Sequence, residues 1–208
     1  ITGGSLNLAA KGALKIIGSQ GAERKGYKGN EMVVSNAAWQ RGVTSLDKLA
    51  NTNVAITQVG SSQHYMMGQI VNIKKIDPAT VVYKPLQDVP NMISAVRSGQ
   101  VDVAFLTPIA AKPLIEKGEI KHLAWFSEVA NYQYGALFGA IKVVTSNPDL
   151  TRRFVRAYAK GNSDYAKAFL RQDPKGDLVV DDETKKAALQ IAKYVAPSTE
   201  PEKAAPSV

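Results

Sequence analysis

The sequence contains no cysteine and only two histidines among its 208 residues. The absence of cysteine excludes disulfide bonds, thiolate-bound metals and thiol catalysis within this chain. His64 and His122 stand without clustered carboxylates, so the sequence predicts no metal site and no cofactor. Partners for a Ser-His-Asp arrangement cannot be placed, which leaves hydrolysis without support. No apolar run has the length of a membrane-spanning helix, so no such helix is expected.

Acidic residues are also few relative to basic ones, and the formal net charge is +8. The basic residues are scattered, and many stand on helix-like segments such as residues 151–161 (TRRFVRAYAKG) and 183–194 (ETKKAALQIAKY). This distribution favours solvated helix faces over a nucleic-acid-binding patch, although it can still attract small anions. With 45% hydrophobic and 21% charged residues, the composition is that of an ordinary globular protein.

The middle of the chain alternates between strand-like and helix-like segments. Gly99 and Gly118 stand where two of these helices are expected to end. Such alternation is typical of an α/β fold with a largely parallel sheet. The expected strands cover residues 53–59, 80–86, 100–106 and 120–126, and the expected helices cover residues 61–73, 89–99 and 107–118.

Both ends of the chain extend this pattern. Residues 6–12 (LNLAAKG) predict a short helix that leads into a strand over residues 13–20. Further on, Asn147 is expected to cap a long helix with Pro148 at its first position. A last helix is expected to follow Asp181 and Asp182.

Two segments have the pattern of strands that leave one structural unit for another. We expect these crossings near Val33–Asn36 and Gly139–Val143. They divide the chain into a central lobe, residues 38–134, and a second lobe made of residues 1–37 and 135–208. Two α/β lobes joined by two strands form a hinge, with a cleft for a ligand between them.

The order of motifs resembles the periplasmic solute-binding proteins of ABC transporters, in the nitrate, sulfonate and taurine branch that includes binders of the thiamine pyrimidine precursor. The resemblance rests on the motif "S-L-x-x-L" before a strand and on "A-x-x-S-G-Q-V-D-x-A" with "TP" after it. It extends over nearly the whole chain. The long segments that carry it are residues 44–71, 85–126 and 147–161.

This resemblance implies a two-lobed α/β fold and a small anionic or zwitterionic ligand, such as a sulfonate, nitrate or a small organic acid. It also implies a membrane permease as partner and a periplasmic or lipid-anchored location. Members of the family begin with a strand and helix that this sequence lacks, so we expect the lobe formed by the chain ends to expose an apolar strand edge.

Two Gly/Ser segments precede helix-like runs, one in each expected lobe. A helix start offers free N–H donors and partial positive charge, which suits an anion, although Ser and Gly are equally common as plain caps. Together with the resemblance, this pairing favours the ligand interpretation. Thr107 is also a candidate, because it follows a strand at the edge where α/β proteins bind ligands. The candidate ligand-binding residues are Gly4, Ser5, Gly60, Ser61, Ser62, His64 and Thr107.

Aromatic residues such as Tyr65, Tyr132 and Trp125 could wall a small organic ligand, although core packing is the more common role. Two other functions remain open at this stage. An enzyme that makes a pyrimidine from a pyridoxal-phosphate adduct would need a lysine beside a reactive histidine, and no lysine follows His64 before Lys74. The effector-binding half of a transcription regulator would need a DNA-binding domain, of which the sequence shows none.

Overall fold

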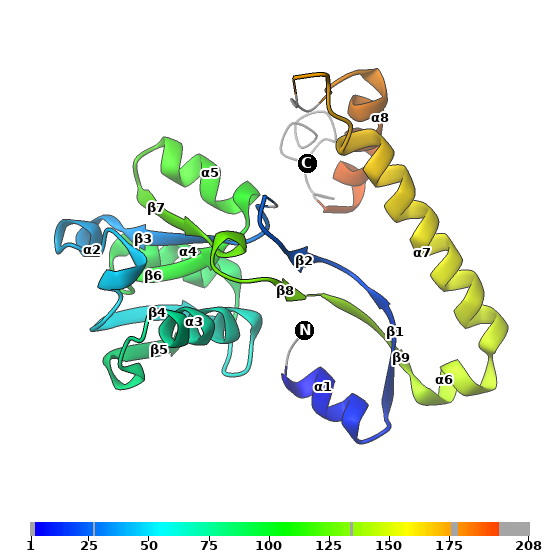
Figure 1. Ribbon diagram of the computed structural model, residues 1–208, viewed down its shortest axis with the longest axis horizontal. Helices are drawn as coiled ribbons and strands as arrows, with labels where there is room; N and C mark the ends of the chain where they lie inside the picture. The colour runs from blue at the N-terminus through cyan, green and yellow to red at the C-terminus, as the bar shows by residue number, and fades with distance from the viewer. Residues whose placement is uncertain (1–2, 27, 134, 176–178, 196–208) are drawn as a thin grey trace. The chain divides into compact units, whose positions relative to one another are not determined.

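The computed structural model describes residues 3–26, 28–133, 135–175 and 179–195, and its largest element is a sheet of five strands (Figure 1). The strand order is β5-β4-β6-β3-β7. Strand β4 pairs in parallel with β5 and β6, whereas β3 pairs antiparallel with both β6 and β7. The strands are β3 (Glu31–Ser35), β4 (Thr52–Ile56), β5 (Val81–Pro85), β6 (Val103–Leu106) and β7 (Ile120–Trp125).

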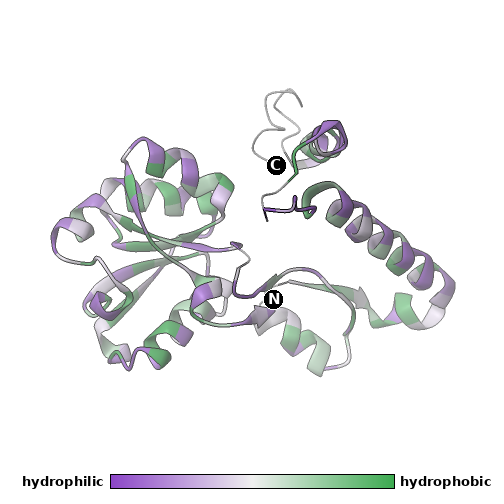
Figure 2. Cartoon of the chain, turned by 45° about the horizontal axis from the view of Figure 1, so that its top comes forward, coloured by the Kyte–Doolittle hydropathy of each residue, from purple (hydrophilic) through white to green (hydrophobic). Residues whose placement is uncertain are grey.

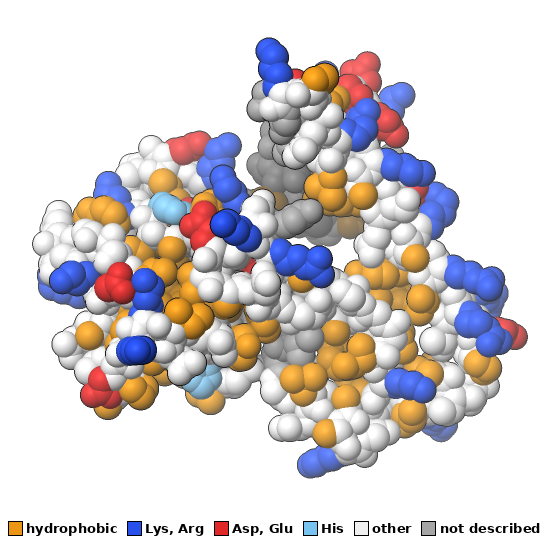
Figure 3. Space-filling model, in the orientation of Figure 1, with side chains coloured by type: hydrophobic (Ala, Val, Ile, Leu, Met, Phe, Trp, Pro, Cys, Tyr) orange, Lys and Arg blue, Asp and Glu red, His pale blue; other side chains and the backbone are white. Residues whose placement is uncertain are grey.

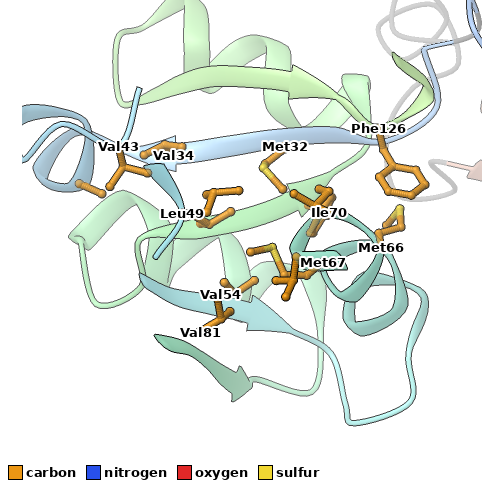
Figure 4. Close-up of a cluster of buried hydrophobic side chains, with 14 residues drawn as sticks. Met32, Val34, Val43, Leu49, Val54, Met66, Met67, Ile70, Val81 and Phe126 are labelled. Atoms are coloured by element: carbon orange, nitrogen blue, oxygen red, sulfur yellow. The ribbon is translucent and has the colours of Figure 1, made fainter. Parts of the chain in front are cut away.

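Helices cover both faces of this sheet, and each face buries its own cluster of apolar side chains. On one face, α3 (Ser62–Ile73) buries Met66, Met67 and Ile70 against the strands (Figure 4). On the other face, α4 (Val89–Ser98) and α5 (Pro108–Glu116) pack against a cluster that includes Val33, Ala55 and Ala104. Alternate residues of a strand point to opposite faces, which is why neighbouring residues of β3 belong to different clusters. The strands of the sheet contain much of the green, hydrophobic sequence in Figure 2.

The position of β3 corrects one expectation from the sequence. Val33 and Val34 lie in the interior of the five-stranded sheet and are fully buried, and Asn36 already begins α2 (Asn36–Gln40). A crossing strand near Val33–Asn36 is therefore wrong, and the sheet is mixed rather than largely parallel. The run of consecutive apolar residues reflects burial on both faces of the strand.

Among the described residues, two short antiparallel pairs of strands are not hydrogen-bonded to this sheet. Strand β1 (Leu14–Ser19) pairs with β9 (Ala136–Ala140), and β2 (Ala22–Glu23) pairs with β8 (Tyr132–Gln133). The expected crossing at Gly139–Val143 coincides only in part with β9, because α6 (Ile141–Ser146) begins directly after it. Among the described residues, β1 and β9 have no further strand partner.

Ile16 of β1 is about half exposed, at 52%, and the expectation of an exposed apolar strand edge in the lobe formed by the chain ends remains a prediction. Helix α1 (Gly3–Ala10) precedes this strand, and none of its residues is buried. The described residues before β8 also form three short 3-10 helices. They are η1 (Leu46–Lys48), η2 (Pro78–Thr80) and η3 (Phe126–Glu128).

The compact units of the chain are residues 1–141 and 142–208. The second unit contains α7 (Pro148–Phe169) and α8 (Asp182–Val195), and Asn147 caps α7 through a bond from the Leu150 N–H, as expected. The Thr184 hydroxyl donates to the Ala168 carbonyl oxygen at 2.8 Å and so joins the two helices. The division into lobes at residues 37 and 134 remains a prediction, whereas the α/β fold class is confirmed. No helix among the described residues combines the length and apolar character that a membrane crossing needs.

Candidate functional site

The start of α3 is built by Gly60 and Ser61. Gly60 has a φ of +81°, a left-handed conformation that glycine adopts without steric cost. Ser61 is the N-cap, and its hydroxyl oxygen accepts the N–H of His64 at 3.4 Å. Only 3% of Ser61 is exposed, so this cap lies inside the protein. Of the two serines at this helix start, Ser61 is therefore the cap.

His64 folds back onto the turn that precedes it. The Gly60 N–H donates to Nδ1 of His64 at 3.0 Å, and the imidazole ring meets the Tyr83 ring edge-on, with 4.4 Å between ring centroids. Because Nδ1 accepts a hydrogen bond, a neutral His64 carries its proton on Nε2. His64 can thus present an Nε2–H donor, whereas the N–H of Gly60 is already used within the chain.

The first backbone N–H groups of α3 are donors that a ligand could use. Among the described residues, no acceptor is found for the N–H groups of Ser62 and Gln63. The first N–H groups of a helix have no partner within the helix and carry its positive partial charge. An anionic group at this end of α3 would therefore meet two free donors.

A pocket of about 610 Å³ lies beside this helix start. The α3 residues that line it follow one helical face, from the cap through the second turn, and the Gly3 N–H of α1 donates to the Gly60 carbonyl oxygen at 3.2 Å. Two stretches more than fifty residues apart in the sequence therefore meet at the pocket. Its lining is Gly3, Leu6, Gly60, Ser61, His64, Tyr65, Gly68, Gln69, Tyr132 and Gln133.

The walls of this pocket are aromatic and carry no formal charge. Tyr65 and Tyr132 lie with ring centroids 4.6 Å apart, one from α3 and the other from β8. Burial, and secondarily the nearby Tyr65, raise the pKa of the Tyr132 hydroxyl above its ordinary value, so this group stays neutral at physiological pH. Among the described residues that line the pocket there is no lysine, arginine, aspartate or glutamate. Such a pocket can bind an organic molecule through its apolar surface and a few donors.

The structure brings together three of the seven residues that the sequence singled out. Gly60, Ser61 and His64 line the pocket. Gly4 and Ser5 lie inside the first turn of α1 rather than before it, and the lining uses their neighbours Gly3 and Leu6 instead. No local pattern in the sequence indicated Gly68, Gln69 and Gln133 as lining residues, because their place depends on the packing of α3 against α1 and β8.

Ser62 and Thr107 do not line this pocket either. Ser62 is the first residue of α3 and follows the cap residue Ser61. Thr107 is the exposed N-cap residue of α5, and its side chain makes no capping bond. Its carbonyl oxygen instead accepts the N–H groups of Ala110 and Ala111.

The part of the chain that the structure describes offers no set of side chains that would hold a metal ion or pyridoxal phosphate. Among the described residues, no three His, Cys, Asp or Glu side chains gather as a metal site would require. A pyridoxal-phosphate aldimine needs a lysine, and none lines the pocket beside His64. The residues of this pocket therefore do not fit that cofactor.

Comparisons with known proteins agree with this fold. Residues 30–168, more than half of the chain, match the family model described as "NMT1/THI5 like". A comparison with curated protein sequences gives no match. Among solved structures, the periplasmic aliphatic sulphonate binding protein SsuA from Escherichia coli is 15% identical, with a TM-score of 0.64 over 89% of this chain and 56% of its own.

Two further solved structures are similar. The alkanesulfonate-binding protein SsuA from Xanthomonas axonopodis pv. citri, bound to MOPS, is 15% identical with a TM-score of 0.68 over 97% of this chain and 62% of its own. The periplasmic sulfonate-binding protein SsuA of a putative sulfonate ABC transporter from Methylobacillus flagellatus KT is 17% identical, with a TM-score of 0.57 over 88% of this chain and 49% of its own. The chain thus spans less than two thirds of the length of these proteins, and at such identities the likeness concerns the fold.

Proposed function

Since the chain belongs to the NMT1/THI5-like family, we propose that it binds a small anionic or zwitterionic solute in the pocket beside α3. The observation that supports this most directly is the pocket itself, where the cap of α3, His64 and two tyrosines surround one space. The cap of α3 lines the pocket, and the N–H groups that follow it, those of Ser62 and Gln63, have no acceptor among the described residues. Such helix-start donors bind anionic groups.

The lining favours an organic solute over a bare inorganic anion. The aromatic walls offer apolar surface that nitrate or sulfate cannot use, whereas a sulfonate or carboxylate with a hydrocarbon part can. The three similar solved structures described above are proteins named for binding sulfonates. A sulfonate or small organic acid is therefore the solute class we propose.

In this proposal the protein carries its solute to the permease of an ABC transporter and catalyses no reaction. The similar solved structures are periplasmic binding proteins, which supports a location outside the cytoplasmic membrane. The proposal rests on the family and the pocket together. No described residue of the pocket favours the enzyme or the transcription regulator over this function.

The test fills the pocket without disturbing the helix. Gly68 lies on the pocket-lining face of α3, and no atom lies within 4 Å of where a Cβ would stand. Gly68→Leu should therefore occupy the pocket, while the exchange of a helical glycine for leucine leaves stability unchanged or raises it by up to about 1 kcal/mol. Solute affinity should fall by more than about tenfold, the equivalent of about 1.4 kcal/mol.

Gly161→Leu is the matched control, because Gly161 is also helical, lies on α7 and has open space around its Cβ position. A thermal-shift panel of alkanesulfonates, aromatic carboxylates, nitrate and sulfate would first identify a solute. A ligand at one hundred times its dissociation constant stabilises the fold by about 2.7 kcal/mol. Calorimetry then measures the affinity of the parent and of both variants for this solute. Equal affinity in the Gly68→Leu variant would show that the solute binds elsewhere.

A further inference from the structure

A bulge in β7 turns two side chains toward the same face of the sheet. Met32 pairs with Ala124, and the next residue of β3, Val33, pairs with His122, so Leu123 is an extra residue in β7. Without it, His122 and Trp125 would point to opposite faces, because they are three positions apart. With it, both lie on the face of Glu31 and Val33. Bulges often serve to redirect a side chain near a functional site.

These side chains line a second pocket, of about 370 Å³, between β7 and α5. It lies on the α4 and α5 face of the sheet, opposite the α3 face, since Val33 belongs to the cluster of apolar residues on that side. From α5 the pocket receives Lys112 and Glu116, one turn apart, with 4.0 Å between Nζ and Oε1. Figure 3 shows histidine side chains, in pale blue, at separate places on the surface of this part of the molecule.

The polar centre of this pocket is the Glu31 carboxylate. Its side chain is only 5% exposed, and its Oε1 lies 2.6 Å from Nδ1 of His122, whose side chain is 39% exposed. An ionised carboxylate only accepts hydrogen bonds, so Nδ1 of His122 is the donor and Nε2 of a neutral ring is left as an acceptor. A buried carboxylate also needs more than one partner to offset its lost hydration. Glu31 and His122 together therefore offer acceptors to a ligand.

The Trp125 ring adds a surface that attracts positive charge. The Nζ of the exposed Lys28 lies 5.4 Å from the centroid of this ring, so a cation already occupies its face. The His122 ring lies beside the indole, with 5.3 Å between centroids. Aromatic faces bind ammonium groups more strongly where water is excluded. Ile115 and Pro108 supply apolar surface next to them.

We propose that this pocket binds a small organic cation, namely a protonated primary amine on a short apolar chain. The ammonium group donates to the Glu31 carboxylate and to Nε2 of His122, and its chain lies against Trp125 and Ile115. The net charge of +8 opposes such a ligand at long range, so its selectivity comes from the local carboxylates. This site is independent of the solute pocket beside α3.

The experiment uses n-butylammonium chloride as the probe, with sodium butyrate and sodium chloride at equal ionic strength as controls. The chain has two tryptophans, and Trp39 packs on the α3 side of the sheet, so its indole N–H signal in a ¹H–¹⁵N NMR spectrum serves as an internal control. Butylammonium should shift the Trp125 indole signal in a saturable manner and leave the Trp39 signal in place. Butyrate, which has the same size but the opposite charge, should shift neither.

Two variants change the affinity in opposite directions. Glu31→Gln keeps the shape of the side chain but removes its charge, and should weaken butylammonium binding at least about tenfold. Lys28→Ala removes a competing cation from an exposed position, so it should strengthen binding without affecting the fold. Glu183→Gln, the same chemical change on α8, should have no effect. The proposal is overturned if butylammonium moves Trp125 no more than butyrate does, or if Lys28→Ala weakens binding.

Discussion

On the α3 face of the five-stranded sheet, the pocket is lined by residues without formal charge, whereas the pocket beside α5 contains two carboxylates, a lysine and a histidine. The first pocket obtains its polarity from a helix start, where the backbone supplies the donors. The second obtains it from the side chains of Glu31 and His122, which a bulge places together. We therefore propose two modes of recognition on one sheet, because its two faces carry different helices.

The comparison predicts that the two faces can be weakened separately. Met66 of α3 and Met92 of α4 are both fully buried, one under each face. Met66→Ala and Met92→Ala should each lower the free energy of unfolding by about 2–5 kcal/mol, through lost burial and the cavity left behind. Urea unfolding of the full chain measures this loss.

Solute affinity should fall only in the Met66→Ala variant, because Met66 supports the helix that lines the solute pocket. Calorimetry at a temperature where both variants remain folded gives this second value. If Met92→Ala weakened solute binding to the same extent, the two faces would not act independently.

A negative charge at the start of α3 should distinguish the pockets by their ligands. Ser62→Asp keeps a residue that suits a helix start and gains a favourable interaction with the helix dipole, about 0.3–1 kcal/mol. It also places a carboxylate beside the free N–H groups of Ser62 and Gln63, so the affinity for an anionic solute should fall more than about tenfold. Titration of the variant with the solute and with butylammonium measures both sites. An unchanged solute affinity would place the anionic group away from the helix start.

The smallest expected effect is a change in the free energy of unfolding, and it compares the starts of α3 and α5, which lie at the same edge of the sheet. Ser61 caps α3 from a buried position, whereas Thr107 precedes α5 without a capping bond from its side chain. Ser61→Ala should therefore lower the free energy of unfolding by about 1 kcal/mol, as the loss of an N-cap does. Thr107→Ala should stay within about 0.5 kcal/mol, as exposed substitutions do. Equal losses in chemical denaturation would mean that the Ser61 bond contributes little.

Local signals in the sequence predicted the elements well. Asn147 before Pro148 predicted the start of α7, and Gly99 predicted the end of α4, where it adopts a left-handed conformation. The serines after Gly60 predicted the start of α3, which Ser61 caps. These features depend on a few neighbouring residues, since a cap satisfies N–H groups within its own turn. The α/β class followed from the alternation of such elements.

The position of β3 in the sheet could not be predicted from local sequence signals. Its apolar run Met32–Val34 fits a strand buried on both faces, but it also fits a strand that crosses between lobes, and periodicity does not separate the two. Pairing partners decide between them, and β3 lies between β6 and β7, some seventy and ninety residues further along the chain.

By itself the sequence determined the helix caps, the turns and the kinds of elements, because each of these depends on hydrogen bonds and backbone angles within a few residues. Only the tertiary structure decided which side chains share a pocket. Gly3 of α1 meets Gly60 in the turn before α3. Glu31 meets His122 across ninety-one positions, because strand register and one extra residue in β7 set which face each of these side chains occupies. A shift of one residue reverses that face, and no local pattern in the sequence records it.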